Sequence, residues 1–569
     1  MKNEIKKFFK GDIEDDLETL KKYSHDASIF EVQPKLVIFP KDAEDVKNLV
    51  KWVNQKKSDF KNSPKSDFYN LSITARSAGT DMSGGPLNES IIMDFTKHMN
   101  KLIEFNHPAL QAPLLDKEGV GGGAFITVQP GMFYRDFEKI VSEKGLMMPS
   151  YPASKGICAM GGIVANNSGG EKTLKYGKTE DYIQSMKVVF TDGNEYEIKP
   201  LSKTELEIKI KQNNFEGNIY KKIWNLIENN REKINKAKPN VSKNSAGYYI
   251  WNVWDQQIFN LNKLLVGSQG TLGIVTEVTF KLVPIPKESK LAIIYLDGVK
   301  KISDLTAELL KFSPESLEVY DDKTLQLAIK FFPSFLKNRG FWGGFRFICG
   351  FWPDLFMLIR NGFPKLVVLA EFASDDKEEI YKKIEDLSKM LKTKKLSYRV
   401  ATSSADAEKY WKIRRESFNL LRNHVKGKRT MPFIDDVIVR PEYLSEFLPK
   451  LEEILSKYPE LEHTIAGHAG DGNFHIIPLV KTDNLQLSQT VIKVADQVYN
   501  LVLKYKGSIT AEHNDGIIRT PYLEKMFGVE ICRLFTEVKN IFDPQNIFNP
   551  GKKTAGDFAS IRKYIIKPN

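Results

Sequence analysis

The chain has 569 residues, of which 41% are hydrophobic and 27% charged, so it has ample material for cores but is too long for a single one. We expect two to four domains of a soluble globular protein. The net charge of +11 and the pI near 9.0 favour anionic partners such as small acids or anionic lipid, and no nucleic-acid-binding motif occurs in the sequence.

Cysteine use indicates a reducing compartment. Cys158, Cys349 and Cys532 are far apart, and the sequence contains no Cys-x-x-Cys. This disfavours both a disulfide framework and iron–sulfur ligation. The first ten residues are basic but lack the apolar core of a secretory signal, so we expect a cytoplasmic protein.

The first predicted elements alternate between helices and short strands. Residues 12–30 are predicted to form a helix followed by a loop, and 35–40 a short buried strand ending at Pro40. Asp42 can cap the next helix, whose apolar residues recur at helical spacing up to Val53. Residues 72–75 then predict a second strand.

A Gly/Ser/Thr-rich loop follows that strand, over residues 76–85. Its exposed backbone N–H groups and hydroxyls suit a pyrophosphate. The loop is not Gly-x-Gly-x-x-Gly, and its surroundings do not indicate a Rossmann unit.

Segments of similar chemistry recur downstream. A strand ends at Pro130-Gly131, a helix is predicted over 133–144, and a loop rich in Gly, Asn and Ser spans 160–170. Such glycines let the backbone approach a flat ligand that makes many hydrogen bonds. Residues 187–193 predict a strand entering a hairpin turn, and 267–278 complete the set.

Two histidines flank a Gly-Asp-Gly turn in the late part of the chain. Strand-like runs on both sides predict a hairpin that would bring His468 and His475 together. Paired imidazoles are good divalent-metal ligands, Glu512 can add a carboxylate, and His513 beside it is a titratable base. The alternative is that these are ordinary loop or core histidines. Three of the eight histidines fall in these two Gly-rich loops, which favours the metal site.

Residues 330–363 form an insertion rich in aromatic and basic side chains. It has no apolar run of 18 residues, so it is not expected to span a bilayer. Aromatic rings among lysines and arginines suit a membrane–water interface. A core helix pair and a contact with another subunit of an oligomer are the alternatives.

In their order along the chain, these motifs resemble the FAD-binding domain of the vanillyl-alcohol oxidase/PCMH flavoprotein superfamily. With the histidine hairpin, Glu512-His513 and the terminal segment 543–552, residues 20–555 are similar to the FAD-linked D-2-hydroxyacid dehydrogenases. The resemblance implies an α+β fold: a two-subdomain PCMH-type FAD-binding domain over 20–285, and a cap domain over 286–505 built on an antiparallel sheet with helices. Residues 506–569 would return to the FAD domain.

The resemblance also implies which residues contact FAD. Non-covalent FAD is expected, because Gly79-Thr80-Asp81 stands where this superfamily often has a linking histidine. The implied contacts are Pro40, Arg76, Ser77, Ala78, Gly79, Thr80, Asp81, Ser83, Gly84, Pro130, Gly131, Gly161, Gly162, Ala165, Asn166, Ser168, Gly169, Gly273, Ile274 and Val275.

The implied reaction oxidises a D-2-hydroxy acid, lactate-like or 2-hydroxyglutarate-like, to the 2-oxo acid, with hydride passing to flavin N5. His513 would be the base, and Arg414 would bind the substrate carboxylate, with Arg415 as the alternative if the register slips by one. A divalent metal, Zn²⁺ or Mn²⁺, held by His468, His475 and Glu512 would stabilise the developing alkoxide.

Other features of the reaction stay open in the sequence. For either arginine, an ordinary surface charge is the alternative. Residues 431–436 and Ile476-Ile477 differ from the family's substrate-binding pattern, which leaves the substrate open. We expect the electron acceptor to be a quinone, or else a flavoprotein or cytochrome. The rival readings are an oxygen-using FAD oxidase and a non-catalytic flavin- or metal-binding protein at a membrane surface.

Overall fold

The computed structural model describes residues 1–566 apart from 64–65, 67, 107–122, 331–361, 425–427 and 482–486. The aromatic and basic insertion, for which membrane contact was predicted, therefore lies almost wholly outside the described residues. Within the described ranges, no helix combines the length and the apolar composition needed to cross a bilayer.

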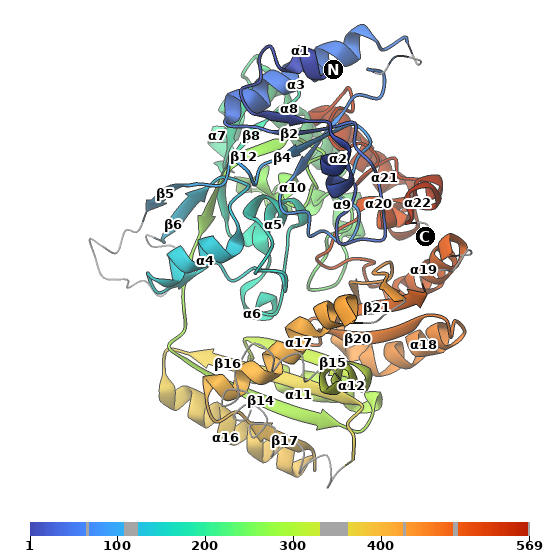
Figure 1. The fold of residues 1–569 in the computed structure, drawn as a ribbon. Coiled ribbons are helices and arrows are strands. Elements are labelled where there is room, and N and C mark those ends of the chain that lie inside the picture. The colour runs from blue at the N-terminus through green and yellow to red at the C-terminus, as the bar shows by residue number, and fades with distance from the viewer. Residues whose placement is uncertain are drawn as a thin grey trace.

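A four-stranded sheet lies nearest the N-terminus (Figure 1). Its strands, in the order β1-β2-β4-β3, are β1 (Asp12–Glu14), β2 (Leu36–Phe39), β4 (Ile91–Asp94) and β3 (Ile73–Arg76). Helix α3 (Ala43–Asp59) packs its apolar stripe on one face, while α2 (Leu17–Tyr23) packs on the other. As predicted, the Asp42 carboxylate caps α3 by accepting from the Asp45 N–H at 3.0 Å.

Residues 12–30 form the predicted helix and loop only after a short strand. Asp12–Glu14 pairs with β2 instead, and the helix begins only after Asp16, whose carboxylate accepts from the Thr19 N–H at 2.9 Å. The local capping signal at Asp16 therefore sets where the helix starts.

A five-stranded antiparallel sheet forms the second layer, in the order β5-β6-β12-β8-β9. Its strands are β5 (Leu102–Asn106), β6 (Phe125–Val128), β12 (Ile274–Lys281), β8 (Ile183–Val189) and β9 (Glu195–Ile198). Its core is shared with α4 (Tyr134–Ser142), α5 (Met160–Asn166), α7 (Lys203–Lys209), α8 (Phe215–Asn229), α9 (Arg231–Ala237) and α10 (Asn262–Leu265). The strand entering a hairpin near residue 190 is as predicted.

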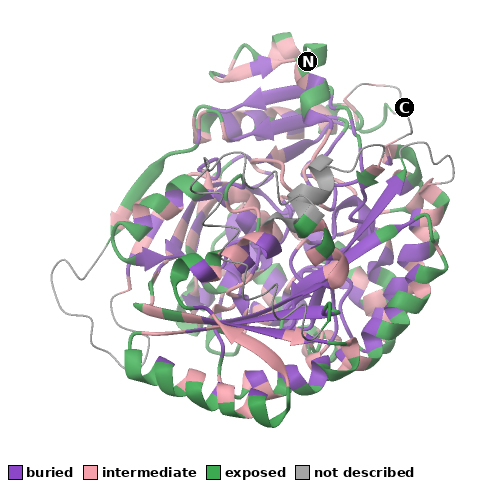
Figure 2. Ribbon diagram, turned by 60° about the horizontal axis from the view of Figure 1, so that its bottom comes forward, coloured by how far each residue is buried: buried purple, intermediate pink, exposed green. Residues whose placement is uncertain are grey.

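An eight-stranded antiparallel sheet occupies the other end of the molecule (Figure 1), in the order β17-β14-β16-β15-β20-β21-β18 with β19 also against β21. Its strands are β14 (Glu288–Leu296), β15 (Ser316–Asp321), β16 (Leu366–Ser374), β17 (Ser397–Val400), β18 (Lys428–Thr430), β19 (Val437–Ile438), β20 (Glu462–His468) and β21 (Asn473–Lys481). Figure 2 shows these strands largely buried and their covering helices exposed on the outer side.

Alternation along the strands assigns each face of this sheet to different helices. One face packs on α11 (Ile302–Leu310), α16 (Lys377–Thr393), α18 (Leu444–Ser456) and α19 (Leu487–Lys504). The other is covered in part by α12 (Asp322–Lys330) and α17 (Ser404–His424), and it bears Glu318, Ala466 and His468. That second face is turned toward the first two layers.

The last part of the chain packs against the first. It comprises α20 (Gly516–Arg519), α21 (Leu523–Phe542) and α22 (Phe558–Tyr564). The Asn549 side chain donates to the Gly85 carbonyl at 2.9 Å and to the Gln269 carbonyl at 2.7 Å. Segments more than 250 residues apart therefore meet behind the Gly-rich loops.

Candidate active site

A cavity of about 630 Å³ lies between the Gly-rich loops and the open face of the eight-stranded sheet. Its volume is in the range of small-molecule and cofactor pockets. The predicted FAD contacts that line it are Arg76, Ser77, Ala78, Gly79, Thr80, Asp81, Pro130, Gly161, Gly162, Ala165, Asn166, Ser168, Gly169, Gly273 and Val275. The predicted reactive residues Arg414, His468, His475, Glu512 and His513 line it as well.

Five predicted contacts are not among the lining residues: Pro40, Ser83, Gly84, Gly131 and Ile274. Three of them pack or hydrogen-bond behind the residues that line the cavity. Gly131 donates to the Met99 carbonyl at 2.8 Å, the Ser83 carbonyl accepts from the Ile517 N–H at 2.8 Å, and Ile274 belongs to the core under the first sheet. Direct FAD contact by these five stays a prediction.

Asp81 shapes the first Gly-rich loop. One carboxylate oxygen accepts from the backbone N–H groups of Ser83 and Gly85 at 2.9 and 2.8 Å, and the other accepts from the Asn166 side chain at 2.8 Å. At Gly79, φ is +66°, and an added Cβ would lie 2.2 Å from the Arg76 guanidinium. The left-handed conformation therefore favours glycine there, and an added Cβ would also force the Arg76 side chain to shift.

The second predicted loop is helical at its start. Residues Met160–Asn166 form α5, and the Gly161 N–H donates to the Pro130 carbonyl at 2.8 Å. A Cβ at Gly161 would come within 2.7 Å of both Pro130 and Ser77. Gly161 therefore allows α5 to pack closely against the segments that carry Ser77 and Pro130. The sequence around Gly161 does not indicate this contact.

The histidine hairpin forms as predicted. Strand β20 ends at His468 and β21 begins at Asn473, so that His468 and His475 project from the same face with their Nε2 atoms 3.3 Å apart. The Glu512 Oε1 atom lies 3.2 Å from Nε2 of His468 and 3.5 Å from Nε2 of His475. Two ligands each about 2.1 Å from a tetrahedral metal would be about 3.4 Å apart, so the three donor atoms fit one metal ion.

Each histidine of the hairpin is oriented by a buried carboxylate. His468 Nδ1 lies 2.5 Å from Glu318 Oε1, and His475 Nδ1 lies 3.0 Å from Asp435 Oδ1. When Nδ1 donates to a carboxylate, Nε2 is left with its lone pair facing the metal position.

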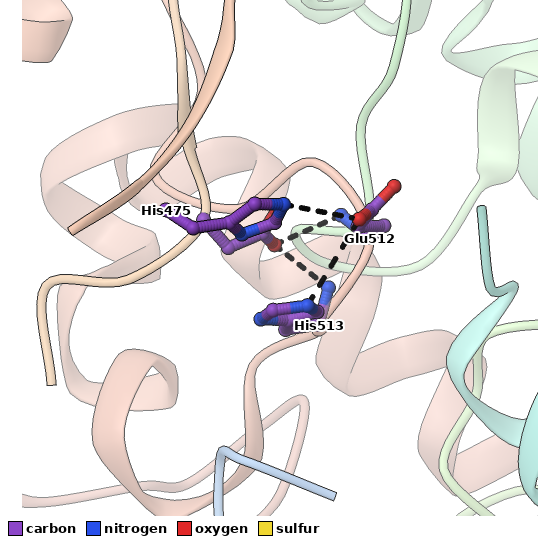
Figure 3. Close-up of side chains that lie close together, drawn as sticks. His475, Glu512 and His513 are labelled. Carbon is purple, nitrogen blue, oxygen red and sulfur yellow. Dashed lines mark hydrogen bonds and ion pairs between the residues drawn. The ribbon is translucent and has the colours of Figure 1, made fainter. Parts of the chain in front are cut away.

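The same two carboxylates hold the residues predicted to handle substrate. Glu318 accepts from Arg414 Nε at 2.9 Å, and Asp435 lies 2.6 Å from His513 Nδ1. His513 stacks on His475 with ring centroids 4.9 Å apart, and its Nε2 lies 3.9 Å from Glu512 Oε1 (Figure 3). His513 therefore has one nitrogen fixed and the other turned toward the metal position.

Charges around the hairpin favour a cation between the donor atoms. Burial by itself lowers the pKa of His475, but the charges of Asp435 and Glu512 raise it to about 10. Burial raises the pKa of the Glu512 carboxyl, yet Lys243 and His468 hold it well below its usual value. A divalent cation can replace the bound protons in such a field.

Asp436 offers another donor in the neighbourhood. One ligand atom from each of Asp436, His475, Glu512 and His513 lies within 4.8 Å of the others. However, Asp436 Oδ2 already accepts from the backbone N–H groups of residues 511–513 at 2.9, 2.9 and 2.7 Å and from the Thr510 hydroxyl at 2.6 Å. Its role is to hold the loop that carries Glu512 and His513, so His468 is the better ligand.

Several residues of this site were not predicted from the sequence. They are Lys243, which pairs with Glu512 at 3.3 Å and Asp471 at 3.1 Å, and the carboxylates Glu318, Asp435 and Asp436. The adjacent acids 435–436 within an otherwise apolar stretch were a usable signal, because buried charges need partners. Lys243 and Glu318 carry no comparable local signal.

Family comparison agrees with this arrangement. Residues 34–199 match the model of an FAD binding domain, and residues 285–553 match that of the C-terminal domain of FAD linked oxidases. Together the two matches cover most of the chain, which carries an FAD binding domain followed by the C-terminal domain of FAD linked oxidases. Its mixed helix and sheet fold, with a PCMH-type FAD-binding domain and an antiparallel C-terminal domain, is as predicted.

Individual proteins that are similar to this chain carry several different names. D-2-hydroxyglutarate dehydrogenase of Escherichia coli (strain K12) is 26% identical over 93% of this chain and 49% of that protein. Glycolate oxidase subunit GlcD of Bacillus subtilis (strain 168) is 27% identical over 96% of this chain and 93% of its own length, and D-lactate dehydrogenase of Anaerostipes hadrus is 25% identical over 93% and 92%. The chain thus spans about half the length of the first of these relatives.

Solved structures of low identity share the fold of this chain. The 4-ethylphenol oxidase from Gulosibacter chungangensis has a TM-score of 0.66 at 15% identity, covering 96% of this chain and 94% of that one. An alkyldihydroxyacetonephosphate synthase has a TM-score of 0.63 at 16% identity, covering 97% and 84%.

Proposed function

We propose that this chain oxidises a D-2-hydroxy acid to the 2-oxo acid with FAD and a divalent metal ion. The main observation behind this proposal is that the donor atoms of His468, His475 and Glu512 lie close together. These residues and His513 line the same cavity as the Gly-rich loops. The names of the relatives support the substrate class.

The two bound groups and the side chains have separate tasks. FAD, when bound, supplies the hydride acceptor that no side chain provides, and the metal supplies positive charge beside the hydroxyl oxygen. The residues that would hold the metal are His468, His475 and Glu512, each with its other polar atom engaged by Glu318, Asp435 or Lys243.

His513 receives the hydroxyl proton of the substrate at Nε2. Asp435 holds Nδ1 at 2.6 Å, which fixes the ring and stabilises the imidazolium that forms, and it raises the pKa of His513 against the lowering effect of burial. As the O–H proton goes to His513, the C2–H bond breaks with its electron pair and C2 becomes the carbonyl carbon.

Arg414 binds the substrate carboxylate. Its Nε donates to Glu318, which also holds His468, so the guanidinium is kept at a fixed position relative to the metal ligands. A planar guanidinium matches a carboxylate better than an ammonium does.

The proposed electron acceptor is a quinone, or else a flavoprotein or cytochrome. The proposed location of the protein is the cytoplasm or the inner face of a membrane. An oxygen-using oxidase of the same family is the second candidate, and it would give one peroxide for each acid oxidised.

An anaerobic flavin-reduction screen tests the proposal. The FAD-loaded, metal-loaded chain is mixed with D- and L-lactate, glycolate, D-2-hydroxyglutarate and longer 2-hydroxy acids, and flavin bleaching is followed by absorbance. We expect bleaching by D acids, and at least about 100-fold slower bleaching in His513→Ala and His468→Ala with FAD retained.

Metal content and a neighbouring histidine complete the test. His468→Ala should also lose bound metal, measured by elemental analysis, whereas His513→Ala should keep it. His463, five residues earlier on β20 and bonded to Glu452 at 2.8 Å, is the matched control, and His463→Ala should bleach normally. Normal bleaching by either site variant would refute the assigned roles.

A further inference from the structure

Arg415, the neighbour of the proposed carboxylate-binding arginine, also lines the cavity. A second guanidinium at this position would suit the distal carboxylate of a dicarboxylic substrate. Whether it can serve that purpose depends on what already holds it.

Glu171 engages Arg415 through two parallel hydrogen bonds. Arg415 Nε donates to Glu171 Oε2 at 2.9 Å, and Arg415 Nη2 donates to Glu171 Oε1 at 2.6 Å. This geometry occupies the Nε–Nη2 edge of the guanidinium, one of the two edges that can bind a carboxylate through two hydrogen bonds. Arg415 is further held by Glu408 at 3.4 Å and by the Trp411 ring at 5.2 Å.

Glu171 is itself fixed and charged. The Tyr151 hydroxyl donates to its Oε1 at 3.0 Å, and the side chain is only 10% exposed. Burial raises the pKa of this carboxyl, but the charge and hydrogen bonds of Arg415 lower it by more. The pKa is therefore below its usual value and the group stays ionised. A substrate carboxylate that reached for Arg415 would have to displace this anion or lie beside it.

Beside the histidines, the sheet face that lines the cavity carries no charged side chain among Thr464, Ala466 and Ile477. Ala466 is the cross-strand partner of His475, and Ile477 is the cross-strand partner of Thr464. Thr464, Ala466 and Ile477 all line the cavity beside the histidines. Ile477 is 8% exposed and Ala466 is 7% exposed. A substrate whose C2 lies at the histidines can lay an alkyl chain on this surface, whereas a carboxylate there would lose its hydration.

We propose that the preferred substrates of this chain are 2-hydroxy acids with one carboxylate and an apolar side chain, and that the Glu171–Arg415 pair disfavours dicarboxylates. The inference rests on the proposed function and narrows its substrate class. Glu171 acts as a positioning residue that keeps Arg415 engaged, and Ile477 forms the surface for the alkyl chain.

A matched pair of five-carbon acids tests the substrate class. D-2-hydroxypentanoate and D-2-hydroxyglutarate differ only in the distal carboxylate, and each is mixed anaerobically with the FAD-loaded, metal-loaded chain. We expect the second-order rate constant of flavin reduction to be at least about 100-fold higher for the pentanoate. Faster reduction by the glutarate would overturn the inference but keep the proposed function, whereas reduction by neither these acids nor D-lactate would overturn the proposed function itself.

Variants test the two contributors separately. Glu171→Gln should lower the pentanoate-to-glutarate ratio by about 10-fold, mainly through a lower KM for the glutarate, because Arg415 loses its bidentate anion. Glu408→Gln, which alters the weaker and more exposed partner of the same arginine, should leave the ratio unchanged. An unchanged ratio in Glu171→Gln would refute the role of Glu171.

Ile477→Ala keeps the inference testable if Glu171→Gln does not fold. It should lower the rate with the pentanoate by about 10-fold while leaving D-lactate, whose methyl group is too short to cover the surface, within about 2-fold. Equal losses for both acids would contradict the apolar surface.

Discussion

Two buried carboxylates each organise a pair of functional side chains. Glu318 bridges His468 and Arg414, and Asp435 bridges His475 and His513. In each pair, one partner is a proposed metal ligand and the other is the residue proposed to handle substrate. Fixing both partners through one rigid anion keeps their relative positions constant, which catalysis requires.

Asp435→Asn should therefore impair two functions together. We expect flavin reduction to slow by about 10²–10⁴-fold and metal affinity to fall by about 10–100-fold, because an amide cannot accept from both histidines as a carboxylate does. Rates are measured by anaerobic stopped flow and metal by elemental analysis.

Asp321→Asn is the matched control for this prediction. Asp321 is also a buried carboxylate, at the end of β15, where it accepts from the backbone N–H groups of Thr324 and Ile465 at 2.8 and 2.9 Å. It should lower stability without slowing reduction. A rate for Asp435→Asn within 3-fold of the unaltered chain would contradict the bridging role.

Among the elements, the β20–β21 hairpin decides the geometry of the metal position. Its turn has to bring two histidines, seven residues apart, onto one face with their Nε2 atoms in contact distance. Gly472 makes this turn possible, because its φ is +76° and an added Cβ would lie 1.8 Å from the Val439 carbonyl oxygen.

Gly472→Ala should destabilise this hairpin. The left-handed conformation costs about 1 kcal/mol for alanine, and the clash with Val439 adds about 2 kcal/mol or more. Thermal unfolding monitored by circular dichroism should show a lower midpoint, and bound metal should fall with it.

Gly145→Ala separates conformation from clash. Gly145 has a similar φ of +71°, but no atom of the described residues lies within 4 Å of an added Cβ, so only the conformational cost is expected. Equal shifts of the midpoint in the two variants would show that the Val439 contact is unimportant.

At the scale of the whole molecule, the last residues hold distant parts together. Lys553 Nζ donates to the carbonyls of Ser245 and Gly247 at 2.8 and 2.7 Å and pairs with Asp515 at 2.9 Å. Lys553 and Asp515 are both fully buried. One ammonium thus joins the end of the chain to the loop after Glu512-His513 and to the first half.

Lys553→Met should lower the stability by about 3–5 kcal/mol, because it leaves the Asp515 carboxylate buried without its partner. Chemical unfolding followed by tryptophan and flavin fluorescence measures the shift of the midpoint. The double variant Lys553→Met/Asp515→Asn should recover part of the loss.

Lys457→Met provides the exposed comparison. Lys457 pairs with Glu453 at 3.2 Å on the surface of the molecule, with side-chain exposures of 59% and 70%. Its loss should barely move the midpoint, since such pairs contribute little. Equal effects of the two substitutions would contradict the joining role of Lys553.

What the amino-acid sequence alone determines here is local. The Gly-rich loops, the capped helix after Asp42, the Gly-Asp-Gly hairpin and the motif Glu512-His513 follow from turn chemistry, capping and periodicity within short stretches. These stretches were enough to predict the matching FAD-linked domains and the fold class, and most of the site residues predicted from them line the cavity.

Only the tertiary structure decided which side chains orient the predicted ones. Glu318, Asp435, Lys243 and the Glu171–Arg415 pair come from segments 40 to 269 residues away from their partners. A buried charge is stable only beside its counter-charge, and no local pattern states which distant segment supplies it. That choice is made when the sheets and loops pack, because packing is what removes these groups from water.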